Sequence, residues 1–336
     1  MQVAVLAHEL FPERAKTAVG LLRYGDHEVR AVLDRDNAGG RVADHLPDVQ
    51  DAPIVASMAD VPEVDALVVG VAPIGGEFDE SWRPDVRAAL ERGSHVLAGL
   101  HDFLAEDDEF AELAAEHGGR LVDLRKPPEN LTVADGTAGD VEATVVTTVG
   151  TDCSTGKMTT AFELRDAARE RGLDAAVVPT GQTGVVIEGW GIVIDRVISD
   201  YAAGAVERLV ETPVGMDLIV VEGQGALVHP AYSGVTTSIL HGSAPDALVM
   251  CHEAGREVVH GYESFDLPPP GAYADLYERM AAPVAEAPVV AGTLNTRGLD
   301  DDAAADAVAA YGDAIDAPAT DPVRHGIPED VLEAIL

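Results

Sequence analysis

Short apolar runs alternate with longer mixed segments along the first 125 residues. The runs are QVAVLA at 2–7, VRAVLD at 29–34, ALVVGVA at 66–72, HVLAGL at 95–100 and RLVDLR at 120–125. Runs this short and this rich in valine and leucine are typical of buried parallel strands. Between them, residues 13–25 and 85–93 have helical spacing and end in glycine. The pattern predicts a Rossmann-like α/β domain over residues 1–125.

A second α/β series follows a connector. Residues 126–140 combine two prolines with small and polar residues and have no apolar periodicity, which favours a linker. From residue 141 onward, apolar runs end in strands expected at 141–150, 174–180, 217–223, 247–253 and 289–295, with helices expected at 157–171 and 195–211. This alternation predicts a P-loop domain with a mainly parallel sheet over 141–336. Residues 300–310 are expected to form a solvated helix with an acidic N-terminus.

The charge balance narrows the class of partner. The chain has 22 basic and 59 acidic residues in 336, a formal charge of −37, yet 47% of its residues are hydrophobic and ordered into runs, so disorder is not expected. A field this negative repels nucleic acid and anionic lipid. Acidic residues spread along the whole chain favour a protein of a salt-loving cytoplasm, with an ordinary acidic enzyme as the alternative.

Other features agree with a cytoplasmic enzyme. Two cysteines cannot form a disulfide framework, and no run approaches the length of a membrane span. The first strand is not followed by G-x-G-x-x-G, so NAD is not predicted. The histidines and cysteines lack zinc-site spacing, so no metal site is predicted.

The stretch GTDCSTGKMTT lies between a predicted strand and a predicted helix, the context of a phosphate-binding loop. Backbone N–H groups would surround a phosphate, and Lys157 would add a charge. The cofactor-binding residues predicted here are Gly150, Thr151, Asp152, Cys153, Ser154, Thr155, Gly156, Lys157, Met158, Thr159 and Thr160.

The loop resembles that of dethiobiotin synthetase and its relatives, because five residues separate its two glycines and EGQG at 222–225 matches an acidic motif that helps to hold magnesium there. Met158, however, stands where the metal-binding hydroxyl is expected. A loop that grips phosphates without a metal is one interpretation. The other is that Thr159 or Thr160 takes over the metal contact.

Further polar residues follow predicted strands, where open α/β sheets bind ligands. His229 or Glu222 could act as a general base. PTGQTG at 179–184 offers Gln182 and Thr183 as hydrogen-bonding groups, or is a plain turn. Cys153 is either an acyl carrier or a small apolar filler.

Cations are scarce enough in this chain to be candidates for binding an anionic substrate. Arg125 and Lys126 lie at the connector and Lys16 at the first helical segment, while Arg256 and Arg297 belong to the second domain. We expect Arg125, Lys126 and Arg256 in particular to bind a dicarboxylate.

Taken together, these segments resemble the DgcN family over nearly the whole chain. The resemblance is carried by GTDCSTGKMTT, PTGQTG, VEGQGALVHPAYSG at 221–234, ILHGSAPDALVMCHE at 239–253 and LNTRGL at 294–299, with AKTAVGLLRYG and DLRKPP in the first domain. It implies N-acetylation of D-glutamate or a similar acidic amino acid by acetyl-CoA. Asn295, within LNTRGL, is assigned to the cofactor site.

Two other functions stay open at this point: an ATP- and magnesium-dependent ligase or kinase, and a nucleotide-binding regulator without turnover. A homo-oligomer is compatible with the sequence, and a small-molecule substrate is expected for either enzyme.

The charge of −37 generates a first prediction. Lowering the ionic strength below molar levels should loosen the fold, because self-repulsion is then less screened. Melting curves from low to multimolar salt measure the effect. A melting temperature that stays constant over this range contradicts the halophilic interpretation.

Overall fold

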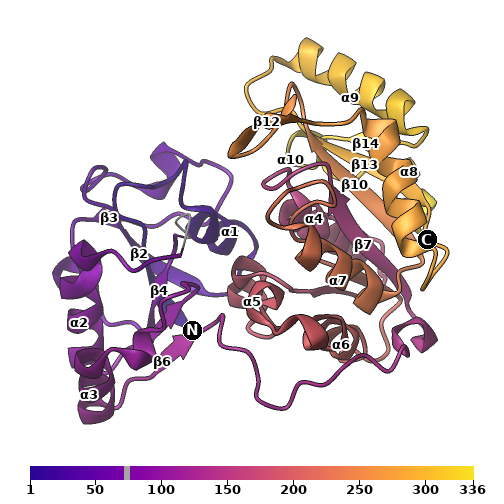
Figure 1. The fold of residues 1–336 in the computed structure, drawn as a ribbon. Helices are drawn as coiled ribbons and strands as arrows, with labels where there is room; N and C mark the ends of the chain where they lie inside the picture. Colours follow the sequence, from indigo (N-terminus) through magenta and orange to yellow (C-terminus); the bar gives the residue numbers. More distant parts are fainter. Residues whose placement is uncertain (72–75) are drawn as a thin grey trace. The chain divides into compact units, whose positions relative to one another are not determined.

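The computed structural model describes residues 1–71 and 76–336, and it confirms an α/β protein with two parallel sheets. The chain forms two compact units. The first comprises Met1–Pro127 and Gln182–Arg196, and the second comprises Pro128–Gly181 and Val197–Leu336. Figure 1 shows the strands and helices of each unit. The return of the chain to the first unit at Gln182 was not anticipated from the sequence.

The first unit is built on a six-stranded sheet of order β3-β2-β1-β4-β5-β6, with parallel pairing throughout its described strands. The strands are β1 (Gln2–Leu6), β2 (Glu28–Leu33), β3 (Ile54–Val55), β4 (Ala66–Val69), β5 (His95–Ala98) and β6 (Leu121–Asp123). The last residue of the predicted run at 66–72 lies outside the described residues. The strand order reverses between β1 and β4, which is where such sheets open a crevice at their carboxyl edge.

Helices cover both faces of this sheet. Figure 1 shows α2 (Arg83–Glu91) and α3 (Asp108–His117) on one side, and α1 (Lys16–Tyr24) beside α5 (Gln182–Glu188) on the other. The α1–α5 contact includes a buried hydrogen bond of 2.8 Å between the hydroxyls of Thr17 and Thr183. Packing against α1 therefore explains why a glycine-containing segment expected as a turn continues as a helix.

The second unit has a six-stranded sheet of order β14-β13-β10-β7-β9-β8, again parallel between its described strands. Its strands are β7 (Thr144–Gly150), β8 (Ala175–Val178), β9 (Leu218–Val221), β10 (Ala247–Glu253), β13 (Val289–Asn295) and β14 (Ala319–Thr320). A small antiparallel hairpin joins β11 (Val258–Val259) to β12 (Tyr262–Asp266).

The second sheet is also covered on both faces (Figure 1). One face carries α4 (Lys157–Glu170), α10 (Pro322–His325) and α11 (Glu329–Ile335). The other carries α6 (Ser199–Val210), α7 (Ser233–Ser243), α8 (Pro270–Ala281) and α9 (Asp301–Ile315). The acidic helix predicted at 300–310 is α9, and the side chain of Asp300 accepts a hydrogen bond from the Ala303 N–H at its start.

Three tyrosines fill the core beside β10 and β13. Tyr273, Tyr277 and Tyr311 are buried among leucine, valine and alanine side chains of the strands and of α8 and α9. Each buried ring of this size contributes about 1.5–3 kcal/mol through the hydrophobic effect. Tyr277 also reaches the end of β7, where its hydroxyl donates to the Gly150 carbonyl at 2.7 Å. The core thereby fixes the start of the predicted phosphate loop.

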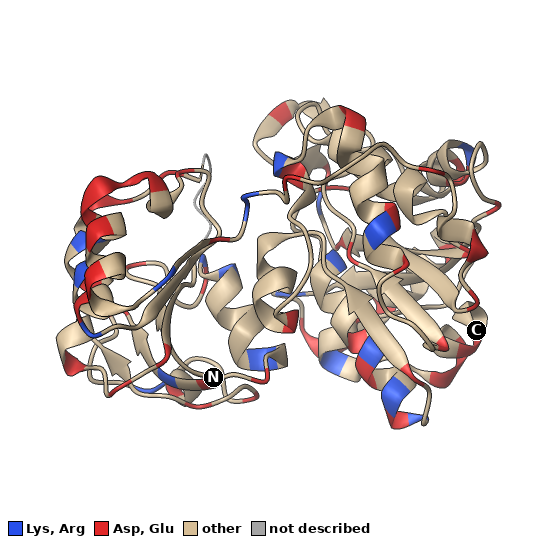
Figure 2. Ribbon diagram, turned by 90° about the horizontal axis from the view of Figure 1, so that it is seen from below, with Lys and Arg blue, Asp and Glu red and all other residues tan. Residues whose placement is uncertain are grey.

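Acidic side chains are distributed over the helices and loops of both units (Figure 2), as the composition implies. Among the described residues, no helix is long and apolar enough to cross a membrane.

A buried carboxylate holds the connector to the second unit. Glu207 in α6 is 6% exposed and accepts hydrogen bonds from the backbone N–H groups of Asp135, Gly136 and Thr137 at 2.6, 2.7 and 2.7 Å. The exposed Glu211, one turn later, accepts only from the Thr137 hydroxyl among the bonds recorded for it by side chains.

We expect Glu207→Ala to lower the free energy of unfolding by about 2–3 kcal/mol, because it leaves backbone donors without their charged acceptor. Glu211→Ala, the matched control, should change it by less than about 0.5 kcal/mol. Urea unfolding measures both values. Equal effects of the two substitutions would contradict this account of the connector.

Candidate functional site

The loop between β7 and α4 has the backbone shape of a phosphate-binding site. Gly156 has φ of +104°, and Ser154 has φ of +57°, so the chain turns tightly before α4 begins at Lys157. Such a turn directs backbone N–H groups toward one point at the positive end of the helix. The position of Gly150 is also tight, because an added Cβ would lie 2.8 Å from the Nζ of Lys157.

Lys157 contacts its own loop in this structure. Its Nζ donates to the Asp152 carbonyl at 2.6 Å and lies 3.4 Å from the Thr155 hydroxyl. The ammonium group is thus held over the cradle by neutral oxygens, which a phosphate would replace with a stronger charged partner.

The carboxylate of Asp152 holds the loop from beneath. The side chain is fully buried, and its Oδ1 accepts from the Cys153 N–H at 2.7 Å. Its Oδ2 accepts from the guanidinium of Arg256 at 3.0 Å and from the His260 N–H at 2.8 Å. Arg256, predicted to bind substrate, also donates to the Cys153 carbonyl at 2.6 Å and pairs with Glu253. The structure therefore places Arg256 in the support of the loop.

The base of the loop is tied to β10. The hydroxyl of Thr151 lies 2.7 Å from Nδ1 of His252, and the His252 ring stacks on Tyr311 at 5.6 Å between centroids. Burial, followed by the positive charge of Arg256, lowers the pKa of His252 to about 4. His252 is therefore neutral at physiological pH, and its place in the loop support was not found from the sequence.

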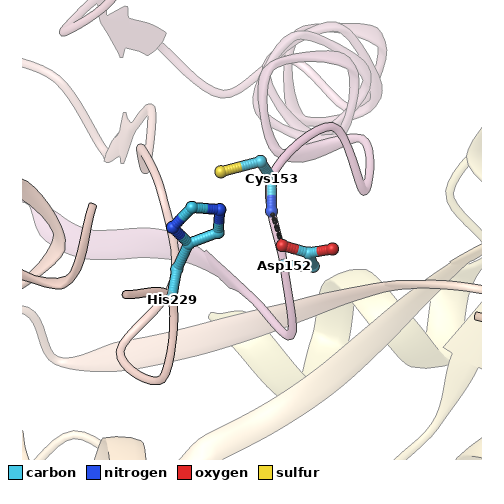
Figure 3. A group of neighbouring side chains, drawn as sticks. All are labelled: Asp152, Cys153 and His229. Carbon is cyan, nitrogen blue, oxygen red and sulfur yellow. Dashed lines mark hydrogen bonds between the residues drawn. The ribbon is translucent and has the colours of Figure 1, made fainter. Parts of the chain in front are cut away.

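Figure 3 shows Asp152, Cys153 and His229 side by side. One ligand-type atom of each lies within 4.8 Å of the others. The three residue types can bind a metal, but both oxygens of Asp152 already accept hydrogen bonds, one of them from a guanidinium that would repel a cation. The donor set fits support of the loop better than a metal centre.

The surroundings of His229 define its protonation. Nδ1 accepts a hydrogen bond from the Ala231 N–H at 3.1 Å, and the ring stacks on Tyr232 at 4.6 Å between centroids. Burial lowers the pKa of His229. A neutral ring whose Nδ1 accepts carries its proton on Nε2, so His229 is arranged to donate a hydrogen bond there. This geometry weakens its predicted role as a general base.

Glu222 follows β9 and is buried beside the loop. Its Oε2 accepts from the N–H groups of Thr180 and Gly181, each at 3.2 Å. Gly223 allows the close approach of this turn to β7, because a Cβ there would lie 1.7 Å from the Thr148 carbonyl oxygen. The structure therefore brings Glu222, Lys157 and the loop into one unit, as the two sequence motifs predicted.

Methionine at 158 is buried, and one of its two proposed substitutes is occupied elsewhere. The Thr160 hydroxyl lies 2.8 Å from that of Thr293 and accepts from the Cys251 thiol at 3.4 Å. Thr160 therefore points into the core and cannot hold a metal at the phosphate. Thr159 is partly exposed and stays a candidate for that contact.

The other predicted substrate residues belong to the first unit. Arg125 is buried, donates from Nε to the Gly99 carbonyl at 2.7 Å and pairs with Asp195. Lys126 is exposed, while Gln182 and Thr183 open α5. Asn295 ends β13 in the second unit and caps the following turn by accepting from the Arg297 N–H at 3.0 Å.

An α/β fold with a phosphate-type loop defines the class of this protein. The chain belongs to the DUF1611 family: residues 132–332 match the model described as a domain of unknown function, P-loop domain, and residues 35–127 match its Rossmann-like N-terminal domain.

Two curated relatives carry the name D-glutamate N-acetyltransferase. The protein from Tritonibacter scottomollicae is 36% identical over 265 residues, which is 77% of this chain and 78% of the relative. The protein from a Pseudoalteromonas species is 36% identical over 266 residues, or 78% of each. A crystal structure of a DUF1611 family protein from Anabaena variabilis matches with a TM-score of 0.94 and 37% identity, over 99% of this chain and 98% of that one.

The loop geometry predicts that Lys157→Ala weakens binding of a phosphate-bearing ligand by about 1.5–3 kcal/mol, the size of one charge-assisted contact. Arg171→Ala removes a cation just beyond the opposite end of α4 and should leave affinity unchanged. Calorimetric titration with coenzyme A and with ATP tests both variants. Unchanged affinity of Lys157→Ala for both ligands would remove the loop from the binding site.

Proposed function

We propose that the protein transfers an acetyl group from acetyl-CoA to the amino group of D-glutamate or a similar acidic amino acid. The observation that carries this proposal is 36% identity, over about three quarters of the chain, to two relatives named for that activity. The class of reaction, N-acetyl transfer, follows from their shared name. The donor and the acceptor are our inference.

The phosphate loop supports coenzyme A as the donor. A kinase or ligase holds magnesium across the phosphates that it cleaves. Coenzyme A brings phosphates that are gripped and released unchanged. A loop with Lys157 and its glycines in place, but with a buried methionine at 158, suits this task.

The chemistry requires a neutral amine. The acceptor ammonium loses a proton, the amine nitrogen attacks the thioester carbonyl carbon, and the carbon–sulfur bond breaks to release the thiol of coenzyme A. Negative charge develops on the carbonyl oxygen during the attack, and a fixed donor there lowers the barrier. The Nε2–H of His229 fits such a donor role, and Glu222 is the candidate base within the second unit.

The acceptor's carboxylates need local positive charge in a protein this acidic. Lys126 is exposed and follows β6, so we propose it as the first such contact. Arg125 is neutralised in part by Asp195, and its exposed share would orient rather than attract the substrate.

Metal dependence separates this proposal from an ATP-dependent ligase or kinase. Because Met158 has no oxygen ligand, formation of acetylated product from acetyl-CoA and D-glutamate should persist in excess EDTA. ATP should yield no ADP under any metal condition. The assay follows product by mass spectrometry in high salt, with L-glutamate as the stereochemical control.

The competing function has its own signature. ADP that forms only with magnesium and a carboxylate substrate would indicate that Thr159 and Glu222 complete a metal shell, and the ligase function would then replace ours. Tight binding of either nucleotide without any product would favour a regulator.

A further inference from the structure

A buried histidine lies at the carboxyl edge of the first sheet. His8 follows β1 by two residues, at the strand order reversal between β1 and β4. Its side chain is 0% exposed, and its Nε2 lies 3.0 Å from Oδ2 of Asp85, which is 6% exposed. The two residues are 77 positions apart in sequence. This pair occupies the edge at which open α/β sheets bind ligands.

The partners of the two side chains fix the proton. Asp85 Oδ1 accepts from the Met58 N–H at 2.6 Å, and Arg35 lies 3.7 Å from Oδ2. Burial opposes ionisation of Asp85, but the hydrogen bonds from His8 and from Met58 outweigh it and lower the pKa of the carboxyl. An ionised carboxylate only accepts, so Nε2 of His8 carries the proton and Nδ1 presents a lone pair. Nδ1 has no hydrogen-bond partner among the described residues.

His95 provides the contrast within the same sheet. Its Nδ1 is likewise buried without a partner among the described residues. Its Nε2, however, lies 3.3 Å from the guanidinium of Arg120, which can only donate. The proton of His95 therefore sits on Nδ1, and that atom is a donor. His95 also begins β5, at the amino edge of the sheet, away from the ligand-binding edge.

The backbone next to His8 is held under strain. Glu9 has φ of +61°, a conformation that residues other than glycine rarely adopt. Its N–H donates to the buried Asp34 carboxylate at 2.6 Å, which also accepts from the Asn37 amide at 2.6 Å. Strain of this kind persists only when the surroundings enforce it, and it clusters at ligand sites.

We propose that His8, oriented by Asp85, is the general base that takes the proton from the acceptor's ammonium group, so that the carboxyl edge of the first sheet binds the amino acid. This inference rests on the proposed acetyl transfer. Lys16 opens α1 after β1, and Lys126 follows β6, so two exposed cations belong to the same edge and suit an acidic side chain.

The proton balance is complete. Neutral His8 accepts one proton at Nδ1 and becomes an imidazolium, which the Asp85 carboxylate stabilises. The freed amine attacks the thioester and loses its second proton as the amide forms. His8 then releases its proton to solvent, and the departing thiolate of coenzyme A takes one up. No oxidant, reductant or metal is required.

Asp85→Asn tests the assignment with little change of volume. The amide oxygen of asparagine can keep the bond from Met58, so its NH2 group faces Nε2 of His8 and moves the ring proton to Nδ1. The base is then lost while the packing stays. We expect kcat to fall by about a hundredfold or more, with the KM for acetyl-CoA unchanged. His8→Gln should lower kcat to a similar extent.

The controls separate catalysis from folding. His95→Gln removes the other buried histidine of this sheet and should keep kcat within about twofold, since surface-edge substitutions rarely reach further. Far-ultraviolet circular dichroism and melting curves in high salt verify that each variant is folded, and calorimetry verifies that each binds coenzyme A as the wild type does.

The outcomes are distinct. A wild-type protein that acetylates no amino acid overturns the proposed function and the role of His8 with it. An active wild type whose Asp85→Asn variant keeps its kcat overturns only the role of the pair. A selective loss in Glu222→Gln, with Asp85→Asn fully active, would assign the base to the second unit instead.

Discussion

The buried carboxylate of Asp152 is the constraint on which the phosphate loop depends. A fully buried charge is costly unless it is paired and hydrogen-bonded, and Asp152 meets both conditions through the Cys153 N–H, the His260 N–H and Arg256. These bonds tie the loop to the segment that leads into the β11–β12 hairpin. Lys157, bound to the main chain of the same residue, is thereby held over the cradle.

The core supports the same loop from the opposite direction. Tyr277 belongs to α8, yet its hydroxyl reaches both the carbonyl and the N–H of Gly150, at 2.7 and 3.4 Å, and the N–H of Leu227 at 3.3 Å. The loop is therefore held by hydrogen bonds from a buried side chain whose ring is fixed by packing. Preorganised donors of this kind reorganise little when an anion binds.

Much of the fold could be predicted because its strands are buried on both faces and read as continuous apolar runs. Each of the ten predicted runs contains a strand in the described structure, including β6 in RLVDLR and β13 in VVAGTLN. The phosphate loop was equally visible, since its glycines and lysine are close in sequence. Short strands such as β3 and β14 were missed, because two residues carry no periodicity.

Features that depend on distant partners could not be predicted. Gln182 and Thr183 look like turn residues until α1 provides a surface for the helix α5, and Arg256 looks like a free cation until Asp152 is placed beside it. His8 was overlooked for the same reason. A lone histidine after a strand has no signature, and its meaning comes from Asp85 in a helix 77 residues away.

The histidines show how much chemistry such partners decide. A backbone N–H at Nδ1 makes neutral His229 a donor through Nε2, whereas a carboxylate at Nε2 leaves His8 with a lone pair on Nδ1. The guanidinium beside His95 has the opposite effect from that carboxylate. Residue type alone makes the three rings equivalent candidates for a base. The hydrogen-bond partner assigns only one of them a lone pair that no group in the described structure uses, and that ring lies at the edge where its sheet would bind a ligand.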